Sequence, residues 1–246
     1  MESQTISLNV HPQILDLYEV LEKNGLHKQK EDVQSLVGYV ESMEYNLSVM
    51  MNEIQEMHAE VKRLHDRGIR NQCGKIISKA EDKIHQAKTM VSVIKVRLID
   101  AAGNAVKTCK EKGKSALIRA VEAMRVSTAL SKIKSGFSHM SQSMRQSAGQ
   151  IDVIRGELHE VGGHMKNAGR ALLGRSAKQA GKLRDFLESC GDTFSKMERS
   201  ADRLIDKIQQ NEKQAKQKQS VKSDLRQLKT QRHEKSKAPV LKEQAR

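Results

Sequence analysis

The sequence predicts an all-α fold, an elongated antiparallel coiled coil or helical bundle of about four long helices. A short helix precedes the bundle, and a frayed basic tail follows it. In residues 33–64 an apolar residue returns at alternating steps of three and four, which keeps it on one stripe of a helix. The only two prolines, Pro12 and Pro239, lie near the ends of the 246-residue chain, so none interrupts the helices between them. With three Phe, three Tyr and no Trp, the core must consist of Leu, Ile, Val, Met and Ala.

The first element is a short helix in "HPQILDLYEVLEKNG". Pro12 suits a first helical position, and Gly25 suits a stop just past the end. Residues 1–26 therefore form an N-terminal segment that packs one apolar face on the remaining chain.

A first long helix is expected from about residue 28 to 66, ending at a turn bounded by Gly68 and Gly74. Its apolar residues form one narrow stripe, here called a seam. A helix with a single seam is not stable alone, because helical stability in proteins comes mostly from packing. Its seam residues are Leu36, Val40, Met43, Leu47, Met50, Ile54, Met57, Val61 and Leu64.

A second long helix spans about residues 77–108 and alternates large seam residues with alanine, which favours close antiparallel packing on the first helix. Gly113 is the expected break after it. Whether residues 114–135 continue this helix or turn back stays open. The large seam residues predicted here are Ile84, Val91, Ile94 and Leu98.

A third seam runs to about residue 172, and a fourth covers residues 180–208, with Gly169 and Gly174 marking the turn between them. The third seam includes Ile151, Ile154, Leu158 and Val161. Opposite it, Gly149, Gly156 and Gly163 recur every seven residues, which indicates either a soft helix or a backbone lying against that face. The bundle thus covers residues 27–210, and the Lys/Gln-rich residues 211–246 form a tail that is largely disordered or an isolated helix.

We find no pattern that indicates catalysis, a cofactor or a metal. The chain lacks inward Glu-x-x-His pairs, HExxH, CxxC, GxSxG and the phosphate-loop spacing. Cys73, Cys109 and Cys190 are an odd number at unrelated spacings, typical of reduced thiols in a cytoplasmic protein. The sequence predicts neither a secretory signal nor a spanning helix, so integral membrane association is not expected. Narrow seams also leave little room for a small-molecule substrate.

The distribution of charge along the chain is the feature that says most about possible binding partners. Residues 1–66 carry a net −7, residues 67–210 carry +14, and residues 211–246 carry +7, which indicates internal pairing, an acidic external partner, or both. Without aromatic residues among the cations, nucleic-acid binding would not depend on base sequence. The same charges would also suit solvated faces or contact with an anionic membrane surface. The candidate anion or nucleic-acid patch consists of Lys107, Lys110, Lys112, Lys114, Arg170, Arg175, Lys178, Lys182 and Arg184.

Two phrases, "KEKGKSALIRAV" and "HMKNAGRALLGR", resemble a domain-of-unknown-function family of gut Firmicutes that is often encoded on conjugative or integrative elements. The resemblance covers roughly residues 10–175. It implies an accessory protein of a mobile element, and it brings no activity, site or ligand.

From these observations we expect a cytoplasmic, non-catalytic interaction or structural protein. Its seams hold the helices together, and its exposed charge selects a protein partner, which can be a second copy of the chain. The alternative is a sequence-independent nucleic-acid-associated accessory factor that uses the basic turns and tail. A secreted or surface-delivered helical hairpin is a third class.

Overall fold

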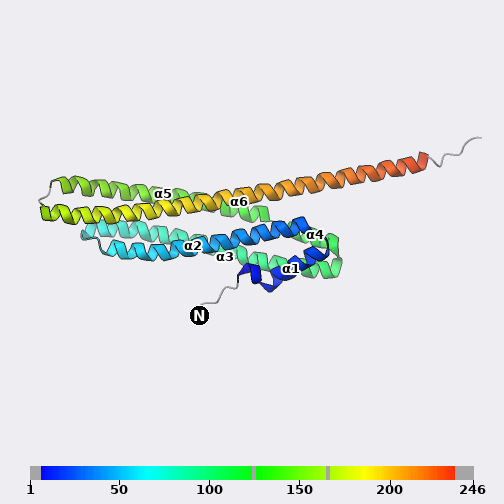
Figure 1. Cartoon of the computed structure of the whole chain (residues 1–246), viewed down its shortest axis with the longest axis horizontal. Coiled ribbons are helices and arrows are strands. Elements are labelled where there is room, and N and C mark those ends of the chain that lie inside the picture. The colour runs from blue at the N-terminus through cyan, green and yellow to red at the C-terminus, as the bar shows by residue number, and fades with distance from the viewer. Residues whose placement is uncertain (1–6, 124–125, 165–166, 236–246) are drawn as a thin grey trace, which may run out of the picture. The chain divides into compact units, whose positions relative to one another are not determined.

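The computed structural model describes residues 7–123, 126–164 and 167–235, and every element within them is helical (Figure 1). Within these residues a 3-10 turn, η1 (Leu8–Val10), precedes six α-helices: α1 (Pro12–Lys23), α2 (His27–Lys62), α3 (Arg67–Lys112), α4 (Lys114–Ala123), α5 (Val126–Gly163) and α6 (Asn167–Lys235). The predicted all-α class is confirmed. The chain divides into two compact units, residues 1–205 and 206–246, so that α6 contributes to both.

In the first unit α2, α3, α5 and the first part of α6 lie lengthwise beside one another (Figure 1). Glu44 of α2 meets Lys95 of α3, and His58 nearer the end of α2 meets Glu81 nearer the start of α3, so these two helices run in opposite directions. Contacts between α3 and α5, between α5 and α6, and between α6 and α2 close the ring of four helices.

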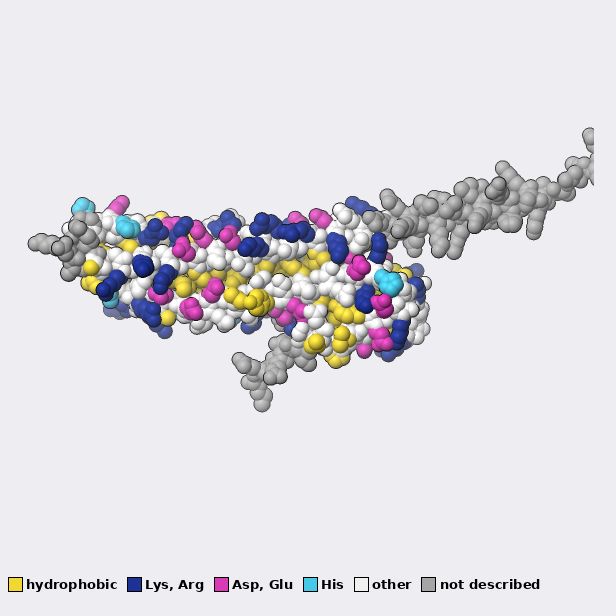
Figure 2. Space-filling model, in the orientation of Figure 1, with side chains coloured by type: hydrophobic (Ala, Val, Ile, Leu, Met, Phe, Trp, Pro, Cys, Tyr) yellow, Lys and Arg dark blue, Asp and Glu magenta, His cyan; other side chains and the backbone are white. Residues whose placement is uncertain are grey.

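The seams close within a single chain. Phe137 of α5 and Phe194 of α6 are fully buried, and their ring centroids lie 5.7 Å apart. Figure 2 shows apolar side chains running lengthwise between the helices, with charged side chains along the edges. The predicted seam residues that are buried are Leu36, Val40, Met43, Leu47, Met50, Ile54, Val61, Leu64, Ile84, Val91, Leu98, Ile151, Ile154 and Leu158.

Three predicted seam residues differ. Met57 and Ile94 are half-buried, and Val161 is 53% exposed, so the assignment of Val161 to the seam was wrong. Four positions after Leu158 the buried residue is Gly162, and a Cβ added there would lie 3.9 Å from Leu173 of α6. Residues three and four positions further along a helix lie on nearly the same face, so either one can continue a seam. After Leu158 the seam continues at the fourth position, Gly162, and not at the third, Val161.

The short N-terminal helix is confirmed with the boundaries that its sequence predicts. Pro12 is the first residue of α1, and Gly25 follows its end with φ of +65°. The apolar face of α1 is fully buried at Ile14, Leu17 and Leu21. Glu41 of α2 fixes η1, because its carboxylate accepts hydrogen bonds from the Asn9 backbone N–H (3.0 Å) and from the side chains of Ser7 and Asn9.

Two turns lie a few residues before the positions predicted from the glycines. The α2–α3 turn covers residues 63–66, and α3 runs through Gly68 and Gly74 because Asp66 caps it by accepting from the Ile69 N–H at 2.8 Å. Likewise α5 ends at Gly163, and α6 runs through Gly169 and Gly174. A helical glycine costs only about 1 kcal/mol, which the packing of long helices overrides.

Residues 114–123 turn back rather than continue the second helix. Gly113 has φ of +78°, a conformation that glycine adopts at little cost, and α4 packs on α3 through the fully buried Leu117. At the other end of the chain, α6 continues to Lys235, past the point where we expected fraying. No Pro or Gly occurs in residues 206–235, and Lys, Gln, Glu and Arg there favour helix.

Candidate interaction surfaces

The structure separates the predicted basic patch into two groups. Lys114 donates to the backbone O of Asn24, just before α2 begins, whereas Lys182 pairs with Glu60, near the end of α2. Since α2 has 36 residues and a helix rises about 1.5 Å per residue, roughly 50 Å separate the two groups. They therefore do not form one binding surface.

The first group lies where α3 ends. Lys107, Lys110 and Lys112 are exposed, and Lys114 follows them at the start of α4. Cations in the last turn of a helix interact favourably with its free carbonyl groups, so part of this charge stabilises α3. The exposed ammonium groups remain able to meet an acidic partner.

Two cations of the second group, Lys182 and Arg184, form ion pairs within the chain. The Arg184 guanidinium lies 2.9 Å from Asp152, 2.9 Å from Glu188 and 3.1 Å from Asp185, and these carboxylates, Asp152 foremost, raise the pKa of Arg184. Lys182 lies 3.2 Å from Glu60.

Arg175 and Lys178 are exposed, and the side chain of Arg170 lies outside the described part of the chain. An anion would thus find fewer available cations here than the sequence indicates.

Internal charge pairing also joins α2 to α3. Lys95 is only 5% exposed, and its ammonium donates to both carboxylate oxygens of Glu44 at 2.8 and 3.0 Å. His58 and Glu81 meet at 2.8 Å. Lys95 is not among the predicted seam residues, because the periodic pattern favours Ile94, although Lys95 stands four residues after the seam residue Val91.

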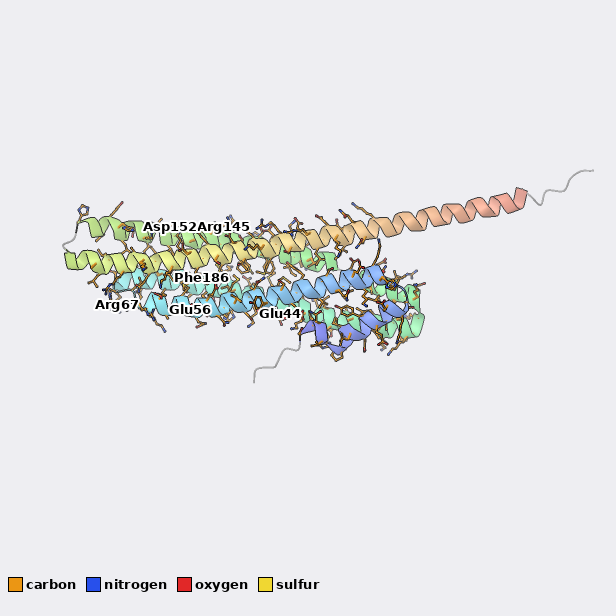
Figure 3. All side chains as sticks on the ribbon, in the orientation of Figure 1. Glu44, Glu56, Arg67, Arg145, Asp152 and Phe186 are labelled. Atoms are coloured by element: carbon orange, nitrogen blue, oxygen red, sulfur yellow. The ribbon has the colours of Figure 1, made fainter. Side chains whose placement is uncertain are left out.

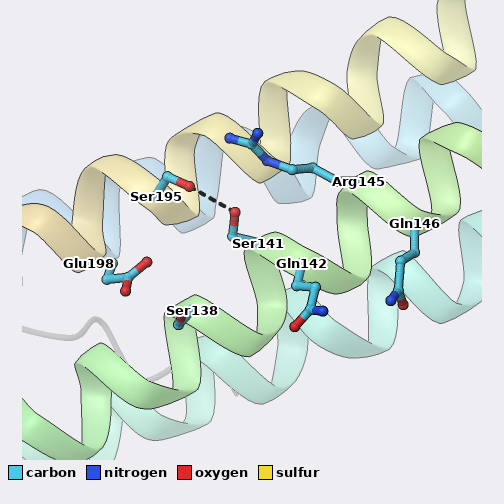
Figure 4. Close-up of a pocket in the computed structure, with 7 residues that line it drawn as sticks. All are labelled: Ser138, Ser141, Gln142, Arg145, Gln146, Ser195 and Glu198. Carbon is cyan, nitrogen blue, oxygen red and sulfur yellow. Dashed lines mark hydrogen bonds between the residues drawn. The ribbon is translucent and has the colours of Figure 1, made fainter.

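A polar contact joins α5 to α6. The Ser141 hydroxyl is buried and donates to the backbone O of Gly191 at 2.8 Å, while its oxygen lies 2.8 Å from the Ser195 hydroxyl (Figure 4). A Cβ at Gly191 would lie 3.4 Å from the backbone O of Ser141, so glycine permits this close approach. This contact is not predicted from the sequence, although Gly191 directly after Cys190, a residue buried in α6, is a usable signal.

An open groove of about 700 Å³ lies beside this contact (Figure 4). Figure 3 places Arg145 and Asp152 on the outer side of the α5–α6 pair, whereas Phe186 lies between α6 and the α2–α3 pair. The groove is open and polar, which suits contact with another macromolecule better than enclosure of a small molecule. It is lined by Ser138, Ser141, Gln142, Arg145, Gln146, Ser195 and Glu198.

Burial makes two of the three thiols unreactive. It raises the pKa of Cys73 to about 11, and burial together with Glu53 raises the pKa of Cys190 further. Because the thiolate is the reactive form, both groups stay protonated near neutral pH. Cys109 is half-buried at the end of α3, with its sulfur 3.8 Å from the Asn24 amide nitrogen.

The described residues contain no group of three or more His, Cys, Asp or Glu side chains that could hold a metal ion. Within that same part of the chain, no helix is long and apolar enough to cross a membrane.

A family of unknown function, DUF6674, matches residues 10–246. The match includes the basic C-terminal residues, which lie beyond the resemblance expected from the two sequence phrases. No curated protein and no solved structure matches the chain. Since the match covers nearly the whole sequence, the chain belongs to the DUF6674 family of unknown function.

Proposed function

We propose that the protein is a non-catalytic interaction protein, an antiparallel coiled-coil bundle that binds a protein partner through its outer faces. The observation that carries this proposal is the burial of the seams within one chain. An apolar seam that is already packed offers no surface to a partner, so recognition must use the exposed side chains. The exposed lysines at the end of α3 and the polar groove beside Arg145 are such surfaces.

The cytoplasmic location and the accessory role in a bacterial mobile element belong to this proposal. The cytoplasmic location rests on the three cysteines, an odd number at unrelated spacings. The mobile-element role rests on the two phrases that resemble the Firmicutes family.

Affinity capture of the tagged full-length chain from its native host tests the proposal. We expect one or more proteins to co-purify and to stay bound after nuclease treatment. Each would then be purified and its binding to the chain measured directly. A matched variant with Lys107, Lys110 and Lys112 changed to Glu reports whether the exposed end of α3 takes part. If no purified candidate binds the chain, the proposed function is wrong.

A second function, sequence-independent nucleic-acid binding, is favoured by one observation. Residues 206–246 carry 12 Lys/Arg against 5 Asp/Glu, so 41 residues hold half of the net charge of +14. Binding of this kind weakens steeply with salt, because each phosphate contact releases counterions. Fluorescence anisotropy with unrelated DNA duplexes should then show equal affinities, a steep salt dependence and loss of binding after deletion of residues 211–246. Weak binding that survives the deletion would contradict it.

A further inference from the structure

The outer face of α5, opposite its seam, is uncharged. Seven positions follow one another at steps of three and four residues, and all seven are exposed, with Val153 at 62%. This spacing places them on a single stripe of the helix. The outer face consists of Ser135, Ser138, Gln142, Gln146, Gly149, Val153 and Gly156.

Such a face is unusual in this chain. About 30% of all residues are charged, yet the 17 residues from 135 to 151 include only Arg145. Solvent-facing stripes of helices normally carry charge, whereas surfaces that meet another helix are depleted in charged residues. At Gly149 and Gly156 an added Cβ would meet no atom within 4 Å, so no other described part of the chain covers this face.

The face also forms one wall of the groove between α5 and α6. Ser138, Gln142 and Gln146 line the groove from α5, while Ser195 and Glu198 line it from α6 (Figure 4). A helix laid along the outer face of α5 could approach closely at the glycines and place its side chains in this groove. Glutamine amides both donate and accept hydrogen bonds, so two such faces can satisfy each other.

The charges that flank the face indicate which helix fits. Lys132 stands before the face, and Glu157 and Glu160 stand near its end, all three exposed. A second α5 in antiparallel orientation brings Lys132 of each copy to the acidic end of the other, whereas a parallel one places like charges together. The point midway between Lys132 and the two glutamates is near residues 145–146, so the two-fold axis of an antiparallel pair lies there. With that axis, Gly149 of one copy faces Gln142 of the other, and Gly156 faces Ser135.

We infer that two copies of the chain associate through the outer faces of α5, antiparallel and related by a two-fold axis near Gln146. This inference rests on the proposed function and names a second copy as one partner. It also gives the exposed glycines of α5 a role, because small residues allow close approach of two helices.

Sedimentation equilibrium of the full chain over a range of concentrations tests the association. We expect a reversible dimer whose dissociation constant rises at least about tenfold when Gln142 and Gln146 are both changed to Glu, because the two-fold axis brings the four new carboxylates together. The matched control changes Gln34 and Gln86, exposed on α2 and α3, to Glu; it adds the same charge and should leave the dimer unchanged. Circular dichroism verifies that both variants fold.

Disulfide cross-linking tests the orientation, in a chain with Cys109 changed to Ser. A mixture of the Ser138→Cys and Val153→Cys chains should cross-link, whereas Ser138→Cys alone should not. Self-linking of Ser138→Cys would instead show parallel helices and overturn the inferred geometry. A chain that stays monomeric overturns the inference, and so does a dimer whose dissociation constant is unchanged by the Gln142 and Gln146 substitutions. The proposed function, by contrast, fails only if no purified partner binds.

Discussion

At the scale of single residues, the buried ion pair between Glu44 and Lys95 has the largest expected effect. Lys95 is 5% exposed, while the Glu44 side chain keeps about a third of its surface in water. A buried pair adds little net stability over an apolar substitute, but a buried charge without its partner is costly. The two partners should therefore respond differently to substitution.

We predict that Glu44→Ala lowers the free energy of unfolding by about 2–3 kcal/mol, because it leaves the Lys95 ammonium buried and unpaired. Lys95→Met, which fills similar volume without charge, should change stability by less than about 1 kcal/mol. Urea unfolding followed by circular dichroism measures both. Equal losses in the two variants would show that Lys95 stabilises the bundle by its charge.

The buried thiols predict a pH dependence. The pKa of Cys73 rises from 9.0 to about 11 on folding, so the folded chain holds this proton more tightly than the unfolded chain does. That contribution to stability is complete below pH 9 and is lost as the pH rises towards 11. We expect unfolding free energies measured between pH 8 and 11 to fall less steeply for Cys73→Ala than for the native chain. Parallel curves would place the Cys73 thiol in contact with water.

At the scale of single elements, the glycines of α5 and α6 serve different purposes. Gly191 lies where α6 touches α5, and an added Cβ would stand 3.2 Å from Arg145 Cγ. Gly149 and Gly156 face open space within one copy of the chain. Within one copy of the chain, glycine therefore permits a contact at Gly191 and only weakens the helix at Gly149 and Gly156.

We predict that Gly149→Ala and Gly156→Ala each raise the stability of the chain by about 0.5–1 kcal/mol, the helix-propensity difference between glycine and alanine. Gly191→Ala should give no such gain, because the crowding against α5 offsets it. Urea unfolding at protein concentrations low enough to populate only single chains makes this comparison. A gain at Gly191 equal to that at Gly149 would indicate that α5 and α6 are less tightly packed.

The N-terminal element depends on one carboxylate. Glu41 holds both Ser7 and Asn9, whereas α1 is fixed separately by its buried apolar face. We predict that Glu41→Ala speeds limited proteolysis before Pro12 while the melting temperature stays within about 3 °C of the native value. A cooperative loss of stability would show that η1 supports the whole bundle.

At the scale of the whole molecule, Ile208 is the last buried residue among the side chains that the structure describes, and in α6 these reach no further than residue 213. The second compact unit begins at Asp206. We predict that a chain ending at residue 210 melts within about 3 °C of the full chain, the shift that about 1 kcal/mol produces at this size. Thermal unfolding followed by circular dichroism measures it. A larger loss would mean that residues 211–246 stabilise the fold.

The all-α class and most of the seams follow from sequence because the steps of three and four continue over whole helices. A periodic pattern cannot settle which of two adjacent residues is buried when both lie near the edge of the stripe. For that reason Lys95 was missed beside Ile94, and Val161 was chosen although the seam passes through Gly162. The turns were misplaced because glycine was given more weight than the Asp66 cap.

The candidate surfaces were harder to predict. Which cations remain exposed depends on pairs distant in sequence, such as Arg184 with Asp152 and Lys182 with Glu60. The groove between α5 and α6 depends on how far each helix is rotated about its own axis. In the sequence, only single residues such as Gly191 indicate this rotation.

The four-residue connection between α2 and α3 has a consequence for biosynthesis. All residues that these two helices need to bury against each other have been translated before the first residue of α5 is added. Contacts that are close in sequence form quickly, so this hairpin can fold co-translationally and wait as a template for α5 and α6. The nascent chain would then expose a single unfinished apolar surface until α5 and the first part of α6 have been synthesised and have left the ribosome.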